Sequence, residues 1–185
     1  TAFPQACVLA GGLGTRLRSI AGEEPKVLVK IGPRPILEWV LLWLEWHGCK
    51  EVVLCLGYQA ERVRSYVSSL TTNMRLVFSV EPETLGTAGA LKWAGDLLAE
   101  QALVVNGDTF FETNLTPLIQ FHNSVGAAVT MALTQAHDTA RFGHVELGAG
   151  GLVRRFDEKP SRAGTGLINA GVYLVQTKHV QGFIP

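Results

Sequence analysis

The chain has 185 residues, of which 47% are hydrophobic and 17% charged, and 16 Lys and Arg residues balance 16 Asp and Glu residues. A formal net charge of zero excludes the broad electrostatic surface that nucleic acids and anionic membranes attract, so we expect neither as a partner. The longest apolar stretch, 36–46, contains two glutamates and is far shorter than the roughly 20 residues of a membrane span.

The chain begins with an apolar, strand-like segment that shows no basic leader and no cleavage-type site, so we expect a cytoplasmic protein. Cys7, Cys49 and Cys55 lie in or beside apolar runs and have no C-x-x-C spacing. This pattern argues against a disulfide framework and against a zinc site. It predicts three buried free thiols.

Short β-rich runs alternate with helical patterns through most of the chain. We expect strands at 6–10, 52–56, 75–80, 102–106 and 127–133, and helices at 36–47, 61–70, 88–98 and 115–123. A strand as apolar as 103–105 is typical of a parallel sheet with helices on both faces. The alternation predicts the α/β class, as a three-layer, Rossmann-like arrangement around a mixed, mostly parallel sheet.

From Phe142 onward the pattern changes to shorter strands with glycine-rich turns at 148–151 and 164–166, and it ends in a strand at 168–175. This change predicts a mixed or antiparallel region that covers one end of the sheet. The chain contains no internal repeat, low-complexity segment or Pro/Ser linker. We therefore expect one continuous domain over 1–185.

The helix expected at 36–47 carries Trp39, Trp43 and Trp46 and is apolar around most of its circumference, while Glu38 and Glu45 share one face. This composition favours a core helix. A subunit interface is the alternative, which leaves a homo-oligomer open.

The histidines have neither an i, i+4 ligand pair nor a nearby cysteine partner, so we expect no transition-metal site. They are His47, His122, His137, His144 and His179. We interpret all five as surface or capping residues.

The segment 8–17 reads as a strand that enters a glycine-rich loop and ends on Arg16 and Leu17. Gly11, Gly12 and Gly14 would let backbone N–H groups approach phosphate oxygens, and a guanidinium offers bidentate contacts to them. The loop is neither a G-x-x-x-x-G-K-[ST] motif nor a G-x-G-x-x-G fingerprint, so a P-loop ATPase and a dinucleotide dehydrogenase are not expected. Taken alone, it fits a triphosphate cradle and a tight turn with positive φ equally well.

A second cation, Lys26, follows Pro25 a short span after this loop, and Pro35 suits the first turn of the tryptophan-rich helix. The residues L-A-G-G-L-G-T-R-L at 9–17, P-K at 25–26 and P-I-L at 35–37 resemble the amino-terminal signature of the sugar-1-phosphate nucleotidyltransferases. The resemblance implies transfer of a nucleoside monophosphate from an NTP to a sugar 1-phosphate, with release of pyrophosphate.

Four more motifs of this family follow in the same order along the chain. They are L-G-T-A-G-A at 85–90, V-V-N-G-D at 104–108, F-D-E-K-P at 156–160 and I-N-A-G-V-Y at 168–173. The resemblance therefore covers nearly the whole chain. It implies a nucleotide-binding part at about 1–135 and a sugar-phosphate-binding part at about 136–185.

The resemblance also implies roles for individual residues. Arg16, Lys26 and Asp108 are the expected catalytic residues, and Asp108 is the expected Mg²⁺ ligand. The expected nucleotide-binding residues are Leu9, Ala10, Gly11, Gly12, Gly14, Thr15, Arg16, Lys26, Glu81, Gly86, Thr87, Ala88 and Asp108. The expected sugar-phosphate-binding residues are Gly107, Gly143, Glu158, Lys159 and Asn169.

Hydrogen-bond complementarity indicates which nucleotide base the protein recognises. Guanine presents two adjacent donors, N1–H and N2–H, which suit a carboxylate, whereas uracil and thymine suit an amide. Glu81 and Glu83 stand just before the turn at 85–89 and no Gln lies nearby, which favours GTP over UTP or dTTP. ATP stays an alternative because backbone groups of the turn alone could read the base, with both glutamates solvated.

The pairing of E-P-x-x-L-G-T-A-G with L-I-N-A-G-V-Y is similar to heptose-1-phosphate guanylyltransferases and to their relatives that act on mannose 1-phosphate or cyclitol phosphates. The family carries a second metal-binding Asp beyond the last of these motifs, which the sequence to Pro185 does not include. We expect either a further C-terminal segment or an incomplete metal site. A catalytically silent nucleotide-binding or regulatory module, and a transferase that uses CTP or UTP, are the alternatives.

Overall fold

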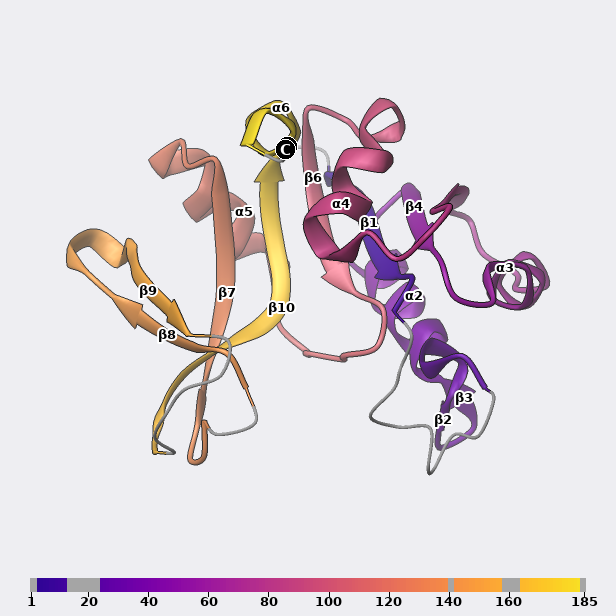
Figure 1. Cartoon of the computed structure of the whole chain (residues 1–185), viewed down its shortest axis with the longest axis horizontal. Coiled ribbons are helices and arrows are strands. Elements are labelled where there is room, and N and C mark those ends of the chain that lie inside the picture. The colour runs from indigo at the N-terminus through magenta and orange to yellow at the C-terminus, as the bar shows by residue number, and fades with distance from the viewer. Residues whose placement is uncertain (1–2, 13–23, 140–141, 158–163, 184–185) are drawn as a thin grey trace. The chain divides into compact units, whose positions relative to one another are not determined.

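The computed structural model describes residues 3–12, 24–139, 142–157 and 164–183. Its strands are β1 Gln5–Ala10, β2 Lys30–Ile31, β3 Arg34–Pro35, β4 Glu51–Leu56, β5 Arg75–Val80, β6 Gln101–Asn106, β7 Val129–Ala136, β8 His144–Leu147, β9 Val153–Asp157 and β10 Gly166–Gln176 (Figure 1). Its α-helices are α2 Ile36–Trp46, α3 Ala60–Ser68, α4 Gly86–Trp93, α5 Leu115–Val125 and α6 Thr177–Phe183, and its 3₁₀ turns are η2 Lys26–Leu28, η3 Gly95–Leu97 and η4 Ala149–Gly151.

The chain forms two compact units, which we call unit 1 and unit 2. Unit 1 comprises Thr1–Thr130 and Tyr173–Pro185, and unit 2 comprises Met131–Val172. β7 and β10 are the two strands in which the chain passes from one unit to the other.

A parallel sheet forms the centre of unit 1, in the strand order β5-β4-β1-β6, and β10 follows β6 in that order. β1 pairs in parallel with β4 and with β6, and β4 pairs in parallel with β5. The residues of β4 and β6 are nearly all buried, as expected for strands covered on both faces. The predicted α/β class with a mixed, mostly parallel sheet is confirmed.

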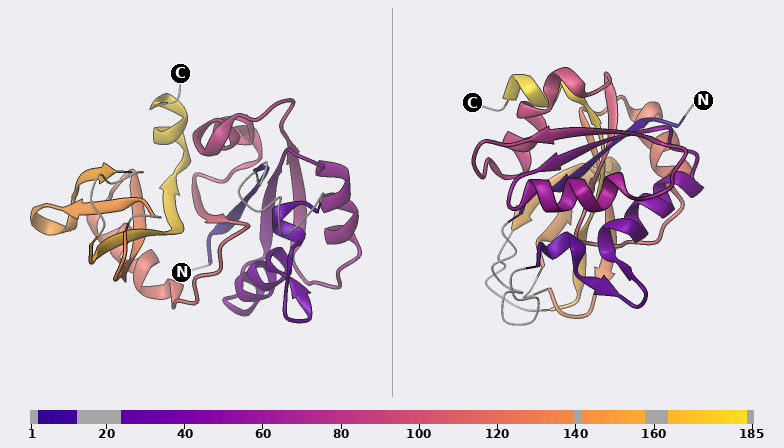
Figure 2. Two further views of the ribbon diagram at one scale, coloured as in Figure 1. Left: turned by 60° about the horizontal axis from the view of Figure 1, so that its bottom comes forward. Right: turned by 90° about the vertical axis from the view of Figure 1, so that its right-hand side faces the viewer.

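Two sets of helices cover the two faces of this sheet. The connections through α2 and α3 move from β1 to β4 and on to β5, whereas the connection through α4 crosses back past β1 to β6. Right-handed crossovers in opposite directions place α4 on the face opposite α2 and α3, which agrees with Figure 2. On the α4 face, Cys7, Val53 and Val104 stand in register and pack into one core cluster with Ala90 and Leu91.

The predicted buried thiols are confirmed, because Cys7, Cys49 and Cys55 are all buried and free. Cys7 Sγ lies 3.5 Å from Cys55 Sγ. This hydrogen bond and burial raise the pKa of the Cys7 thiol well above its usual value. The Cys7 thiol is therefore neutral, and both cysteines belong to the apolar core.

The tryptophan-rich helix is only partly a core helix. Trp43 is 8% exposed, as predicted, whereas Trp46 is 82% exposed, so the core assignment is wrong for that residue. Trp39 donates its Nε1–H to the carbonyl of Ile31, 2.9 Å away, and so fastens α2 to the short β2 strand. The helix ends at Trp46, two residues past its last buried residue, Leu44, which leaves that indole beyond the core.

The surface assignment of His122 is also wrong. This residue of α5 is fully buried, and its Nδ1 lies 2.8 Å from Thr130 Oγ1 while its Nε2 lies 3.3 Å from Gln176 Nε2. An amide nitrogen can only donate, so His122 accepts at Nε2 and donates from Nδ1. Burial lowers the pKa of His122, which keeps the imidazole neutral between these partners.

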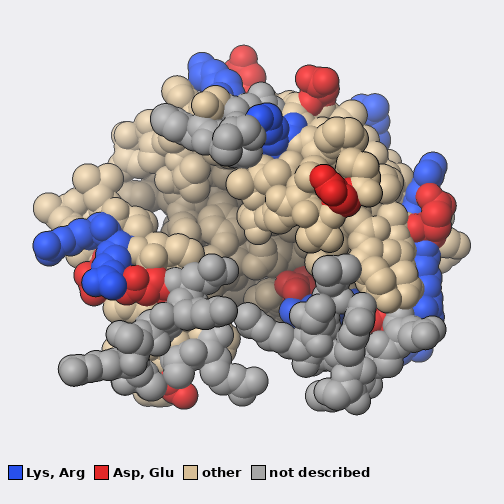
Figure 3. Space-filling view, viewed as in Figure 1, with Lys and Arg blue, Asp and Glu red and all other residues tan. Residues whose placement is uncertain are grey.

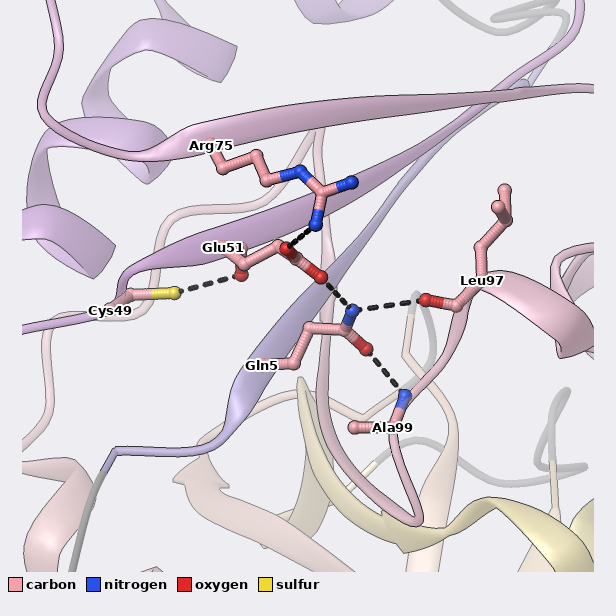
Figure 4. A network of polar contacts seen from close by, with 6 residues as sticks. All are labelled: Gln5, Cys49, Glu51, Arg75, Leu97 and Ala99. Atoms are coloured by element: carbon pink, nitrogen blue, oxygen red, sulfur yellow. Dashed lines mark hydrogen bonds and ion pairs between the residues drawn. The ribbon is translucent and has the colours of Figure 1, made fainter.

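A polar network closes the edge of the sheet where the parallel strands begin (Figure 4). Gln5 donates to Glu51 Oε1 at 2.5 Å and to the carbonyl of Leu97 at 3.0 Å, and its own side-chain oxygen accepts the N–H of Ala99 at 2.7 Å. Arg75 pairs with the other oxygen of Glu51 at 2.7 Å. The network therefore holds the first residues of β1, β4 and β5 together.

Unit 2 is antiparallel, as the change of pattern after residue 142 predicts. β8 pairs antiparallel with both β9 and β10, and β7 pairs with β10.

Acidic and basic side chains lie close to one another on the visible face of the molecule, without a large field of one sign (Figure 3). None of the helices in the described part of the chain is long and apolar enough to cross a membrane.

Candidate active site

A cavity of about 270 Å³ lies at the carboxyl ends of the parallel strands of unit 1. From β1 the chain crosses first to β4 and β5 on one side and then back past β1 to β6 on the other. Open α/β sheets bind ligands at the point where the strand order reverses in this way. The residues that line the cavity come from all four strand ends, the η2 turn and α4; they are Leu9, Gly11, Gly12, Lys26, Val27, Cys55, Glu81, Thr84, Gly86, Thr87, Ala90, Asn106 and Asp108.

Glycines allow two backbone segments to approach each other closely at the end of β1, one after β1 and one after β4. A Cβ on Gly57 would lie 2.8 Å from the carbonyl oxygen of Gly11, and a Cβ on Gly11 would lie 3.1 Å from Glu81 Oε1. The carbonyl of Gly11 accepts the N–H of Tyr58 at 3.3 Å, which continues the β1 to β4 ladder beyond both strands. Among the residues that the structure describes, no atom lies within 4 Å of a Cβ added to Gly12.

Lys26 and Asp108 meet at this cavity although 82 positions separate them in the sequence. Lys26 Nζ forms an ion pair with Asp108 Oδ2, and the two side chains are 33% and 30% exposed. Lys26 lies in the η2 turn, which the 2.8 Å hydrogen bond from Leu28 N–H to the Pro25 carbonyl closes. The predicted catalytic lysine and metal-binding aspartate are therefore neighbours.

The turn before α4 is organised by Glu81, which is 9% exposed. Its Oε2 accepts the N–H of Leu85 at 3.0 Å, and its own N–H donates to the carbonyl of Leu56 at 2.8 Å. Gly86 begins α4 with a φ of 72°, a conformation in which glycine is favoured. Of the two glutamates considered for base recognition, only Glu81 lines the cavity, and Glu83 is exposed on the turn.

Gly107 follows β6 and donates its N–H to the carbonyl of Leu9 at 2.9 Å. A Cβ at this position would lie 3.0 Å from that carbonyl oxygen, so a larger residue would push the β6 end away from β1. Asn106, the residue before Gly107, lines the cavity. The sequence analysis includes it in the V-V-N-G-D motif but assigns it no role. Its position as the last residue of an apolar strand is the signal that identifies it.

Thr84, Val27 and Cys55 also line the cavity without having been predicted. Cys55 belongs to a run that reads as wholly apolar strand, so nothing in the sequence marks it. Conversely, Ala10 is 4% exposed and Ala88 is exposed, and neither lines the cavity.

The predicted sugar-phosphate residues Gly143 and Asn169 lie together in unit 2. The N–H of Asn169 donates to the carbonyl of Gly143 at 3.2 Å, and the side-chain oxygen of Asn169 accepts the N–H of Gly171 at 2.8 Å. Gly171 has a φ of 74° inside β10, which lets the strand turn about the asparagine side chain. Gly14, Thr15, Arg16, Glu158 and Lys159 lie outside the residues that the structure describes.

The donor set at Asp108 fits a magnesium ion of the kind that also binds substrate phosphates. Among the described residues, no group of three or more His, Cys, Asp or Glu side chains is placed to hold a metal ion. Mg²⁺ commonly uses one or two carboxylates and completes its shell with water and phosphate oxygens. The Asp108 carboxylate already holds a cation, the Lys26 ammonium, so its oxygens are placed to balance positive charge at the cavity.

Comparison with known proteins gives consistent matches over the whole chain. A family model described as nucleotidyl transferase matches residues 5–183. The chain is 39% identical over 171 residues to the D-glycero-alpha-D-manno-heptose 1-phosphate guanylyltransferase of Campylobacter jejuni, an alignment that covers 92% of this chain and 75% of that protein.

The chain is also 36% identical over 175 residues to the mannose-1-phosphate guanylyltransferase catalytic subunit beta of Drosophila melanogaster, of which it spans only 47%. Its fold matches the crystal structure of HddC from Yersinia pseudotuberculosis complexed with GMP-PN with a TM-score of 0.86 and 32% identity, over 99% of this chain and 81% of that one.

Proposed function

Because the chain belongs to the nucleotidyl transferase family, we propose that it is a guanylyltransferase that transfers GMP from GTP to a sugar 1-phosphate of the heptose or mannose type. The other product is pyrophosphate. The observation that carries this proposal is the cavity at the strand ends, where a glycine-bounded backbone, the Lys26 ammonium and the Asp108 carboxylate converge.

The reaction needs no nucleophile from the protein, because an oxygen of the sugar phosphate attacks the α-phosphorus directly. The protein must hold two mutually repelling polyanions in line and offset the charge that grows in the transition state. Lys26 supplies an ammonium on a flexible stem for the phosphates, and no described residue lies within 4 Å of a Cβ added to Gly12, where the phosphates would approach the backbone. Asp108 would hold Mg²⁺, which supplies charge neutralisation at the triphosphate when it is bound.

We assign the nucleotide to unit 1 and the sugar phosphate to unit 2. Unit 1 contains the cavity with Lys26, Glu81 and Asp108, and unit 2 contains the hydrogen-bonded pair of Gly143 and Asn169. An amide side chain suits sugar hydroxyls because it both donates and accepts. Because the proposed reaction consumes GTP, which cells hold in the cytoplasm, we place the reaction there.

Glu81 is the residue that we assign to guanine. It lines the cavity, and although Oε2 accepts the N–H of Leu85, a carboxylate has about four acceptor positions and so retains capacity for N1–H and N2–H. Glu81→Gln keeps a carbonyl oxygen for Leu85 and loses the charge, so the turn is preserved. Because hydrogen bonds to a charged group contribute roughly 1.5–3 kcal/mol, we expect kcat/KM for GTP to fall by about 10- to 100-fold while that for ATP is unchanged.

The matched control is Glu83→Gln, which removes a carboxylate from the same turn outside the cavity and should preserve the preference for GTP. If Glu81→Gln leaves the ratio of GTP to ATP unchanged, backbone groups read the base and the assignment of Glu81 is wrong.

The function itself is tested by pyrophosphate release with each of the four NTPs against a panel of sugar 1-phosphates. We expect turnover with GTP and a heptose or mannose 1-phosphate. Preference for another NTP would contradict guanylyl transfer, and absence of turnover with every pair, in a protein that binds GTP, would favour the silent module.

A further inference from the structure

The ion pair between Lys26 Nζ and Asp108 Oδ2 joins two groups that the proposed reaction uses separately. The ammonium is needed at the phosphates, and the carboxylate is needed at the metal. Each side chain is about one third exposed on the cavity, at 33% and 30%, so solutes can reach both. In the structure the two groups neutralise each other instead.

Both oxygens of Asp108 are engaged in this arrangement. Oδ2 accepts from Lys26, and Oδ1 accepts from the hydroxyl of Thr109 at 3.2 Å. A magnesium ion requires a carboxylate oxygen in its compact inner shell, at a distance that leaves no room for an ammonium on the same side. The Lys26 ammonium therefore competes with a divalent ion for Asp108.

We infer that Lys26 is the resident cation of Asp108 and that the nucleotide's phosphates must draw it away before Asp108 accepts a divalent ion. This inference rests on the proposed function for its nucleotide and its metal. The exchange conserves favourable charge contacts, because Lys26 moves from one carboxylate to a polyanion while a divalent ion takes its place. It makes metal binding at Asp108 depend on bound nucleotide.

Side-chain rotation is sufficient for this exchange. The backbone of Lys26 is held by the closed η2 turn and by buried Val27 and Leu28, and the end of β6 is held by the 2.9 Å bond from Gly107 to Leu9. A lysine carries its charge on a flexible four-carbon stem, so the ammonium can leave Asp108 while its Cα stays in place. All of the residues concerned belong to unit 1.

The test measures Mn²⁺ affinity by electron paramagnetic resonance in the nucleotide-free protein. Lys26→Met should bind Mn²⁺ roughly tenfold more tightly than the wild type, because removing a unit charge a few ångströms from a divalent ion in a hydrated site has an effect of that order. Adding Asp108→Asn to Lys26→Met should abolish the gain. Lys26→Arg, which keeps the charge, should bind Mn²⁺ as the wild type does.

Lys30→Met is the matched control, since it removes one positive charge from an exposed strand residue four positions away and should leave Mn²⁺ affinity unchanged. Equal Mn²⁺ affinity in Lys26→Met and the wild type would overturn the inference. So would an equal gain in Lys30→Met, because the effect would then be one of net charge.

A reciprocal measurement uses a non-hydrolysable GTP analogue with all divalent ions chelated. Asp108→Asn, which is almost isosteric, should bind the metal-free analogue more tightly than the wild type, because Lys26 is then released to the phosphates. Weaker or equal binding would overturn the inference, and this arm decides the question if Lys26→Met does not fold. Absence of guanine-nucleotide binding by the wild type would instead refute the proposed function, while the Mn²⁺ measurement would still judge the competition between Lys26 and the metal.

Discussion

Substituting Gly57 with alanine should both destabilise the protein and disturb its nucleotide site. The new Cβ would lie 2.8 Å from the carbonyl oxygen of Gly11 and 3.2 Å from its Cα, and both are backbone atoms that no side-chain rotation can move aside. Forcing atoms into a packed position typically costs 1–3 kcal/mol, which for a chain of this size lowers Tm by about 2–12 °C. The KM for GTP should rise because Gly11 is displaced.

The assay is thermal unfolding followed by circular dichroism without ligands, together with steady-state kinetics. Gly12→Ala, next to Gly11 after β1, is the matched control, because an added Cβ there meets no atom of the described residues within 4 Å and the substitution should leave Tm unchanged or slightly raised. A Tm for Gly57→Ala equal to that of Gly12→Ala would refute the argument that the close approach of Gly11 and Gly57 builds this loop.

Three further predictions concern catalysis and stability. Asp108→Asn should nearly abolish metal-dependent turnover while the melting temperature is retained, since an amide is a poor Mg²⁺ ligand of similar shape; wild-type turnover at limiting Mg²⁺ would contradict this. Lys159 is assigned to the sugar phosphate from its motif alone, and Lys159→Ala should raise the KM for the sugar phosphate by about 10- to 100-fold while the KM for GTP is unchanged. An equal rise in both KM values would contradict that assignment. Burial lowers the folded-state pKa of His122 below its unfolded value of about 6.5, so its contribution is complete above that pH and is lost as the pH falls toward the folded-state pKa. Urea titrations of the wild type and His122→Gln should therefore show a steeper loss of unfolding free energy in the wild type, by up to about 1.4 kcal/mol per pH unit, and parallel curves would refute this.

The local pattern of residues determined most of the secondary structure. Alternation of apolar runs predicts β1, β4, β5 and β6 to within a residue of their observed bounds. The signal is strongest for β4 and β6, because strands buried on both faces must be apolar along nearly their whole length. α4 was predicted too long: it ends at Trp93, and a 3₁₀ turn follows at 95–97. Gly95 and Asp96 are weak helix formers, so a propensity argument sees the change only faintly.

The sequence also identified the chemistry of the site through motifs in a fixed order, and the family match supports that identification. The order of the motifs along the chain indicates which residues belong to one site, but it does not indicate which of those residues are in contact. The strand order β5-β4-β1-β6 brings four distant strand ends to one cavity, which the η2 turn with Lys26 also lines, and there Lys26 contacts Asp108. Glu81 rather than Glu83 lines the cavity because Glu81 is turned inward and accepts the N–H of Leu85, whereas Glu83 is exposed.

Burial of individual polar and aromatic residues was decided only by the tertiary structure. His122 has no periodic signal that distinguishes it from a surface residue, and it is buried where Thr130 of β7 and Gln176 of β10 contact it on α5. Trp46 continues an apolar helix pattern, yet it extends past the core and is exposed. Periodicity reports which face of an element is apolar, whereas burial depends on where the neighbouring elements end, and that information is held in contacts between residues far apart in the chain.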